Sequence, residues 1–344
     1  WVYVVRPALG YLLIFFVAWK YLDSLDRIKS FYFYVIILTA ISAAWGVIQF
    51  VNGYFPFEMN YIVQHDAVHL VFIQGRWRSF GTMGSPAHYG VVMAYMVVVC
   101  GLLLRLDYRP WQKLFFLFTM VMALFALVFS GARSGYAVLP ISLMVMVGLA
   151  RNIKLYALSA VAGVGLVIVL IMPSDNYHIQ RIQSTFKAGE DESFNVREEN
   201  RKMITPWILA HPMGGGLGST GVWGQRFSPG TFLANFPPDS GYVRIAVEMG
   251  WIGLLLYALL WVVIMGKALL GFWKMKNPQA KTLVMALMVS ITPLIVVETA
   301  QDIVGKLPSN LLFWVWLAML FKTIRLEQQQ GETASKHHST AKFH

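Results

Sequence analysis

The sequence predicts an all-α polytopic membrane protein. Hydrophobic residues occupy 57% of the 344 positions and charged residues only 13%, whereas soluble domains carry about 25% charged residues. Apolar runs long enough to cross a bilayer recur along the chain, separated mostly by short polar loops rich in Lys and Arg. Because a single aqueous core cannot bury this much apolar surface, lipid must be the solvent for most of it.

About nine apolar runs approach the roughly 17–25 residues that a membrane helix needs. They lie near 3–19, 31–50, 86–104, 111–129, 135–150, 155–172, 243–266, 282–297 and 303–321. We therefore predict about six N-terminal transmembrane helices within 1–172 and about three C-terminal ones within 241–322. The polar tail, 323–344, is expected to be disordered and cytoplasmic, since it has too little apolar content to pack.

The distribution of basic residues predicts the orientation. The loops around Lys20, Arg105, Arg151, Lys267 and Lys322 carry fourteen Lys and Arg in total, whereas the alternate short loops carry four. By the positive-inside rule the first set is cytoplasmic. The same rule accounts for the net charge of +11, so nucleic-acid binding is not predicted. The chain then starts outside at Trp1, without a signal peptide, and we expect further helices upstream.

Two long segments, 51–85 and 173–240, lie outside by this topology. Long connections are uncommon unless they have a function. In the second, 196–211 has the pattern of an amphipathic helix, for which we expect a place along the membrane surface. The Gly-rich run that follows, 211–224, is expected to be a loop. It lacks the Lys-Ser/Thr of a phosphate-binding loop.

Arginine is the more frequent basic residue of the outer segments. There are seven outer arginines against three lysines, at Arg76, Arg78, Arg133, Arg181, Arg197, Arg201 and Arg226. Because the guanidinium fork matches phosphate and carboxylate oxygens, this surplus predicts a site for a pyrophosphate or an acidic glycan. Contacts with lipid headgroups and loop carboxylates are the alternative. Arg133 stands between two spans with almost no loop, which favours either a functional role or snorkelling to the interface.

The stretch 237–257 holds the candidate acid–base groups. Asp239 follows two prolines at the mouth of a span. A carboxylate at a partly desolvated surface holds its proton more strongly, which suits a general base; an N-cap role is the alternative. Arg244 and Glu248 are spaced i, i+4, so a mutual ion pair competes with a role in substrate binding. Glu298 and Asp302 share a helical face, which fits either a cation site or pairing with arginine.

No metal and no cofactor is predicted. His65, Asp66 and His69 have the spacing that metal ligands on a helix would have. A pair of them could reach one metal ion, but no motif indicates a third protein ligand. The single cysteine, Cys100, lies in an apolar run and rules out a disulfide within the chain.

Four motifs together resemble a known family. RWRSFGTMGSPAHYG (76–90), FSGARSG (129–135), NRKMITPWILAHPMGGGLG (200–218) and PPDSGYVRIAVEMGWIG (237–253) are similar to the successive landmarks of the O-antigen ligase and O-antigen polymerase superfamily. The resemblance implies a metal-independent membrane glycosyltransferase of the GT-C class. It would act at the periplasmic face of the bacterial inner membrane, on a glycan donor linked to undecaprenyl pyrophosphate and a glycan or lipid-linked acceptor.

The resemblance also implies roles for individual residues. Arg78, Arg133 and Arg201 match family arginines thought to hold the pyrophosphate. The family's His-Asn motif aligns on Asp239 and the residues to Tyr242, and its Glu-x-Gly on Glu248. We predict Asp239 as the catalytic base, with Tyr242, Arg244 and Glu248 contributing to substrate binding.

Replacement of the ligase histidine by Asp239 favours a polymerase over a ligase. A ligase or a protein O-oligosaccharyltransferase shares the chemistry and remains an alternative. A polysaccharide transporter or flippase is the alternative from another class. It would predict broken helices at mid-membrane depth and charges deep in the spans, whereas the charges here cluster near the outer helix ends.

Overall fold

The computed structural model describes residues 2–73, 75–150, 153–174, 176–185, 192–238 and 240–340. Almost all of its regular structure is helical. The elements in chain order are α1 (Val2–Tyr21), α2 (Leu25–Asn52), α3 (Pro56–Gln64), α4 (Val68–Val71), β1 (Phe72–Ile73), β2 (Arg76–Trp77), α5 (Pro86–Leu103), α6 (Pro110–Ser130), α7 (Arg133–Ala150), α8 (Ile153–Ile171), α9 (Tyr177–Thr185), α10 (Glu192–Ala210), α11 (Gly221–Phe227), α12 (Phe232–Asn235), α13 (Gly241–Lys274), α14 (Pro278–Val297) and α15 (Ser309–Thr340).

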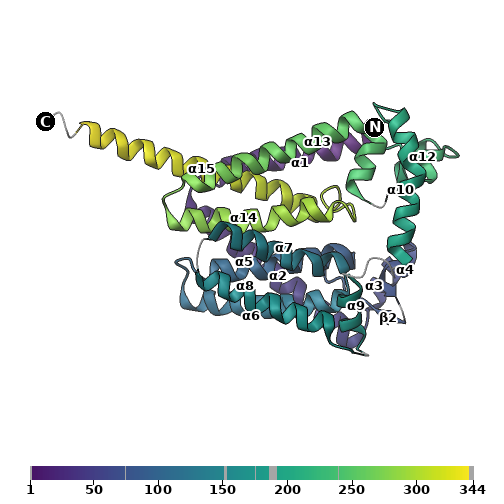
Figure 1. Cartoon of the computed structure of the whole chain (residues 1–344), viewed down its shortest axis with the longest axis horizontal. Coiled ribbons are helices and arrows are strands. Elements are labelled where there is room, and N and C mark those ends of the chain that lie inside the picture. The colour runs from purple at the N-terminus through teal and green to yellow at the C-terminus, as the bar shows by residue number, and fades with distance from the viewer. Residues whose placement is uncertain are drawn as a thin grey trace.

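The long helices lie side by side along one axis of the molecule (Figure 1). Within the described residues, eight of them are long and apolar enough to cross a membrane, which confirms the predicted all-α multi-pass membrane protein. The ninth predicted span corresponds to α8, whose apolar part, Ser159–Ile171, is shorter. The short elements α3, α4, α9 and α12 gather at one end of the bundle together with α10 (Figure 1). We call this end the loop end.

Helix α5 and helix α14 form the centre of the bundle. Helix α5 packs against α6, α7 and α14, and α14 also packs against α15. Glycine allows two helices of this core to approach closely: a Cβ on Gly135 of α7 would lie 2.7 Å from the backbone carbon of Gly90 on α5. Small residues at such contacts are the usual means by which membrane helices pack tightly. This contact fixes the first turn of α7 against α5.

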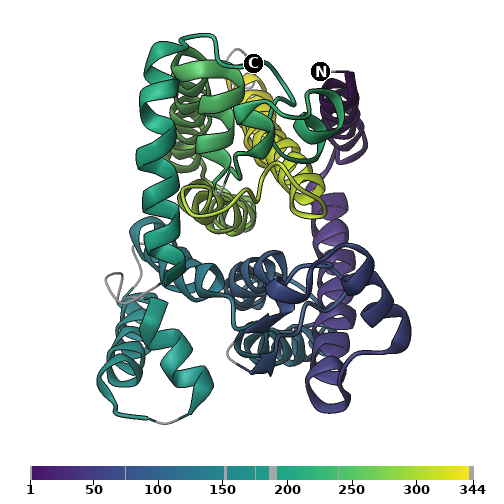
Figure 2. The ribbon, with the colours of Figure 1, turned by 90° about the vertical axis from the view of Figure 1, so that its right-hand side faces the viewer.

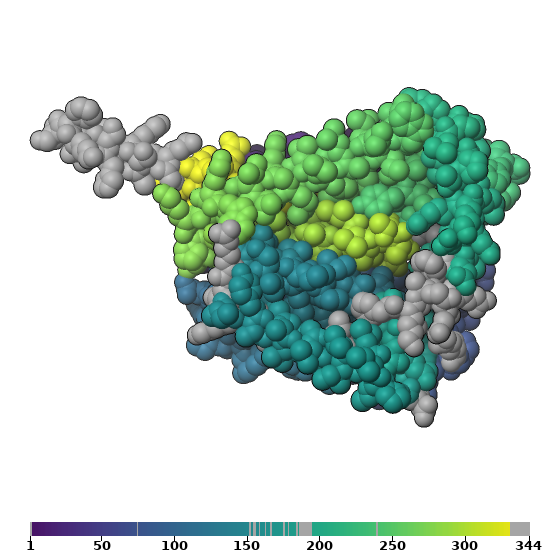
Figure 3. Space-filling model, in the orientation of Figure 1, coloured from purple at the N-terminus to yellow at the C-terminus, as the bar shows by residue number. Residues whose placement is uncertain are grey.

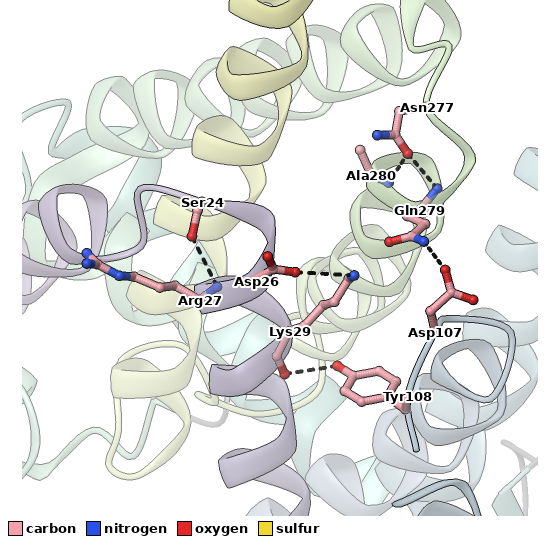
Figure 4. A network of polar contacts seen from close by, with 9 residues as sticks. All are labelled: Ser24, Asp26, Arg27, Lys29, Asp107, Tyr108, Asn277, Gln279 and Ala280. Carbon is pink, nitrogen blue, oxygen red and sulfur yellow. Dashed lines mark hydrogen bonds and ion pairs between the residues drawn. The ribbon is translucent and has the colours of Figure 1, made fainter. Parts of the chain in front are cut away.

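The helix ends away from the loop end are joined by a polar network (Figure 4). The Tyr108 hydroxyl donates to the backbone oxygen of Lys29 at 2.9 Å, and the Gln279 side-chain amide donates to Asp107. The Asn277 side chain caps α14 by accepting from the backbone N–H of Gln279 at 2.9 Å. The network therefore ties α2, the turn between α5 and α6, and α14 together.

Helix α10 lies along the outside of the loop end, as seen in the end-on view of Figure 2 and at the right of the surface in Figure 3. Part of its apolar face is covered by protein, and its predicted place along the membrane surface stays a prediction. Ile204 is fully buried and packs in a cluster with Leu233, Phe236 and Val247. Ile204 is thus covered by residues of α12 and α13, whereas Met203 and Leu209 of the same helix are exposed.

The last helix differs from the prediction at both ends. It starts at Ser309 rather than near 303, because residues 298–308 form a turn that contains Gly305 and Pro308, which interrupt a helix. It continues to Thr340, through the segment predicted to be a disordered tail. That segment contains Glu, Gln, Lys and Ala, which favour the helix.

Candidate functional site

Arg78 is a buried arginine at the loop end. It follows strand β2 and is 9% exposed. Its Nε donates to the backbone oxygen of Ser130 at 2.8 Å, and its Nη1 donates to that of Leu70 at 3.1 Å. Its backbone N–H donates to the oxygen of Val71 at 2.8 Å. The guanidinium is thus fixed between α4 and the turn that joins α6 to α7.

Arg181 on α9 lies beside Arg78. The Nε of Arg181 donates to the oxygen of Gly131 at 3.3 Å, the residue after the Ser130 that Arg78 contacts. Burial and the neighbouring charge of Arg181 lower the pKa of Arg78 to about 10. Two guanidinium groups held this close favour an anion between or beside them. The sequence counts Arg181 among the outer arginines but does not single it out, since its position depends on where α9 packs.

Arg133 begins α7 at the same turn. Gly131 precedes it with a left-handed φ of +54°, and a Cβ on this glycine would lie 3.4 Å from the Nε of Arg78. The turn therefore needs glycine both for its backbone and for its contact with Arg78. Arg78 therefore contacts the turn from which Arg133 begins α7. That the two arginines bind the same group stays a prediction.

Arg201 lies elsewhere, at a groove between α10 and α13. The groove has a volume of about 270 Å³. Its lining is mainly apolar and includes Ile204, Ile208, Val243 and Leu254. The polar members are Arg201, Thr205, Ser240, Tyr242 and Thr299. Arg201 itself is exposed. The groove therefore offers a cation next to an apolar surface, an arrangement suited to an amphiphilic ligand.

The turn 298–308 links this groove to the arginine pair. Thr299 lines the groove, and two residues later the Gln301 side-chain amide donates to Ser134 Oγ at 2.8 Å. Ser134 adjoins Arg133 in sequence. The two regions are thus joined by one short turn, although Arg201 does not belong to the turn of Arg78 and Arg133.

Asp239, the predicted base, lies outside the described residues. Its neighbour Ser240 lines the groove with Arg201. Ser240 also caps α13, because its Oγ accepts from the backbone N–H of Val243 at 3.1 Å. The N-cap role considered for Asp239 therefore belongs to Ser240.

The three other predicted binding residues are held by internal partners. The Tyr242 hydroxyl donates to the oxygen of Ile295 at 2.8 Å. Arg244 pairs with Asp302 at 3.3 Å, and the buried Glu248 accepts from Thr220 Oγ1 at 2.8 Å. The ion pair considered between Arg244 and Glu248 does not form, because partners distant in sequence satisfy each group. Their roles in substrate binding stay predictions.

The Gly-rich run packs backbone against backbone on α13. The N–H groups of Gly215 and Gly216 donate to the oxygens of Val247 and Glu248, each at 2.9 Å. Gly250 interrupts α13 with a φ of +71°, and a Cβ there would lie 1.9 Å from the oxygen of Pro212. The glycines therefore allow the loop after α10 to pack against the break in α13.

The carboxylates of the turn 298–308 are buried. Asp302 accepts from Arg244 and also from the N–H of Gly305 at 3.2 Å, so of the two roles considered for it, pairing with arginine is the one observed. Glu298 is 1% exposed. Among the described residues, no three His, Cys, Asp or Glu gather as metal ligands. The Nδ1 of His65 lies 2.9 Å from the oxygen of Tyr61.

Residues 118–258 match the family model described as O-antigen ligase. The match contains Arg133, Arg201 and Asp239, and it begins after Arg78. No curated protein and no solved structure matches the chain. The predicted resemblance is confirmed over this segment: residues 118–258 of this multi-pass membrane protein are similar to O-antigen ligase, which supports the O-antigen ligase and polymerase superfamily.

Proposed function

We propose that the protein transfers glycan units from undecaprenyl pyrophosphate to a growing glycan, at the periplasmic face of the bacterial inner membrane. The observation that carries this proposal is the groove between α10 and α13. The groove has a volume of about 270 Å³, and Arg201 lies there beside an apolar lining. Ser240, the residue that follows Asp239 in the sequence, is part of the same lining. A polyprenyl diphosphate has the same two parts, an anionic headgroup and an apolar chain.

The arginine pair supports a diphosphate site. Arg78 is held rigidly by two backbone oxygens and lies beside the positive charge of Arg181. Such a pair gains from a bound dianion, because charge-assisted hydrogen bonds are strong where water is scarce. Arg133 adds a third cation at the same turn. These groups are suited to stabilising the charge that develops on a departing diphosphate.

The proposed step is a direct displacement. Asp239 accepts the proton of an acceptor hydroxyl, whose oxygen forms a bond to the anomeric carbon of the donor sugar. The bond between that carbon and the diphosphate oxygen breaks, and the diphosphate leaves with the electron pair. The anomeric centre is inverted. The arginines supply the positive charge, so the step needs no metal.

Asp239→Asn tests the assignment of the base. The amide keeps the size of the side chain but cannot take up the proton, so chain elongation in a complemented deletion strain should fall by at least about a hundredfold. Asp66→Asn, a change of an exposed carboxylate on the same side of the bundle, is the control and should elongate normally. Full elongation by Asp239→Asn rules out Asp239 as the base.

A ligase is the second candidate, because the matched family model is described as O-antigen ligase. The glycan product separates the two. Loss of a polymerase leaves a single repeat unit on the acceptor, whereas loss of a ligase leaves the acceptor bare. Gel analysis of the surface glycan in a deletion strain therefore distinguishes them.

A further inference from the structure

We propose that Trp19, Lys322 and Arg325 form a binding site for the headgroup of an anionic phospholipid. The site lies where the last turn of α1 meets α15, two helices that pack against each other. It is separate from the arginines and the groove of the candidate functional site, and it does not depend on the proposed glycosyl transfer.

The site lies at the end of the bundle away from the loop end. Helix α1 starts near the loop end, because Tyr3 stacks on Trp223 of α11 with ring centres 4.9 Å apart, and α11 packs against α12. Trp19 belongs to the last turn of α1 and so lies at the other end. The distribution of basic residues predicts that this end faces the cytoplasm, where anionic lipids attract basic groups.

Two cations contact the same aromatic ring. Lys322 Nζ lies 5.4 Å and Arg325 Cζ lies 5.7 Å from the centre of the Trp19 ring. The two basic residues are three apart in the sequence, so their side chains leave the same side of α15. A cation within about 6 Å of an indole ring is attracted by its electron density. The ring therefore gathers two positive charges at one point between two helices.

The two cations have no carboxylate partner within the part of the chain that the structure describes. Arg27, at the start of α2, differs in this respect, because it pairs with Asp23 at 2.9 Å. Lys322 and Arg325 repel each other across the ring that they share, and an anion that contacts both relieves this repulsion. The pair is therefore suited to a phosphate group.

The surroundings of Trp19 favour a lipid over a free anion. Leu12 and Phe16 precede Trp19 by seven and three residues, so they lie on the same side of α1. Both are exposed, and none of the described residues of α1 is buried. A phospholipid whose phosphate contacts the two cations can lay an acyl chain along these side chains. Tryptophan is itself typical of the headgroup level of a membrane.

The charge of the headgroup determines which lipid fits. Phosphatidylglycerol carries one uncompensated negative charge, whereas the quaternary ammonium of phosphatidylcholine neutralises its phosphate. A basic residue near the membrane surface strengthens binding to anionic lipid by roughly fivefold. The two cations of this site therefore predict a preference of roughly thirtyfold for phosphatidylglycerol.

A titration of the full chain with short-chain lipid tests the site. The protein in detergent is titrated with dioctanoyl phosphatidylglycerol or dioctanoyl phosphatidylcholine, and bound lipid is counted by native mass spectrometry. In Lys322→Gln/Arg325→Gln, the affinity for phosphatidylglycerol should fall by roughly thirtyfold, and the affinity for phosphatidylcholine should not change. Because a ligand of the folded state stabilises it, phosphatidylglycerol should raise the unfolding midpoint of the wild type more than that of the variant.

Lys267→Gln/Lys274→Gln is the matched control. It removes the same charge from two exposed positions of α13. These positions flank Gly271, and a Cβ on Gly271 would lie 2.8 Å from Ile324 of α15, so the depth along the bundle is similar. Because exposed charges away from the site are screened by salt, the control should stay within about threefold of the wild type. Equal losses in both double variants would show a diffuse attraction and overturn the site.

Two further variants distinguish a lost site from a folding defect. Lys322→Arg/Arg325→Lys keeps both charges and should bind phosphatidylglycerol like the wild type. Trp19→Leu keeps an apolar side chain but removes the ring, and its affinity should fall by about threefold. If the charge-preserving variant loses as much affinity as Lys322→Gln/Arg325→Gln, charge is not what binds the lipid, and the proposal fails.

Glycerol 3-phosphate separates a lipid from a free phosphate. It carries the phosphate without acyl chains, so at equal concentration it should neither compete with dioctanoyl phosphatidylglycerol nor raise the unfolding midpoint. If it binds to the wild type as tightly as the lipid does, the site takes a free phosphate and the assignment to a phospholipid is overturned.

Discussion

The side-chain amide of Gln301 donates a 2.8 Å hydrogen bond to Ser134 Oγ, and this contact joins the turn after α14 to the first turn of α7. Ser134 adjoins Arg133 in sequence. Gln301 lies two residues from Thr299, which lines the groove of Arg201. The contact therefore couples the two basic regions of the candidate site.

Removal of either partner should weaken this coupling. Gln301→Ala and Ser134→Ala are each expected to lower the free energy of unfolding by about 0.5–1.5 kcal/mol, the usual net value of one hydrogen bond. In a double-mutant cycle the combined variant should lose less than the sum of the two. Chemical unfolding in detergent measures these values, and strict additivity would show that the contact contributes nothing.

Arg78→Lys should damage the site although it conserves the charge. Lysine cannot reproduce the fork by which Arg78 holds the oxygens of both Ser130 and Leu70. We expect a loss of about 1–3 kcal/mol in stability and slower elongation. Arg105→Lys, at the opposite end of the bundle, is the control. Equal activity of wild type and Arg78→Lys would contradict a bidentate role.

Arg244→Ala should leave the side chain of Asp302, which is 3% exposed, without its cation. The expected loss is about 1–3 kcal/mol, reduced from that of a fully buried pair because Arg244 is partly exposed. Arg244→Ala/Asp302→Asn removes the stranded charge and should recover part of the stability. Thermal unfolding of the two variants compares them directly, and no recovery in the double variant would argue against the pair.

Gly250→Ala should disrupt the contact between the Gly-rich run and α13. The residue has a φ of +71°, and the new Cβ would lie 1.9 Å from the oxygen of Pro212. A loss of more than about 2 kcal/mol is expected from backbone strain and the clash together. Gly266→Ala, in the same helix but with open space around its Cβ, is the control.

That control should be neutral or slightly stabilising, because alanine favours a helix over glycine. Both variants can be compared by yield and by unfolding midpoint after purification. Similar effects of the two substitutions would contradict the role assigned to the break at Gly250.

Local sequence determined the helices of this protein. Eight of the nine predicted spans correspond to helices that are long and apolar enough to cross a membrane, because apolar length and short polar loops act within a single segment. The helix α10 and the Gly-rich loop follow in the same way from periodicity and glycine content. The family motifs also lie within short stretches, and for this reason the match at residues 118–258 agrees with the predicted resemblance. Asp239 stays a prediction.

The tertiary structure alone decided which groups meet. Arg244 pairs with Asp302 and not with Glu248, and Arg78 lies beside Arg181. These partners are separated by long stretches of chain, and helix spacing gives no information about them. The pKa of Glu298 also depends on packing, because burial raises it to about 7 and the nearby Asp302 adds to this. Charge in a membrane protein acquires its role from packing, since burial determines both its energy and its partners.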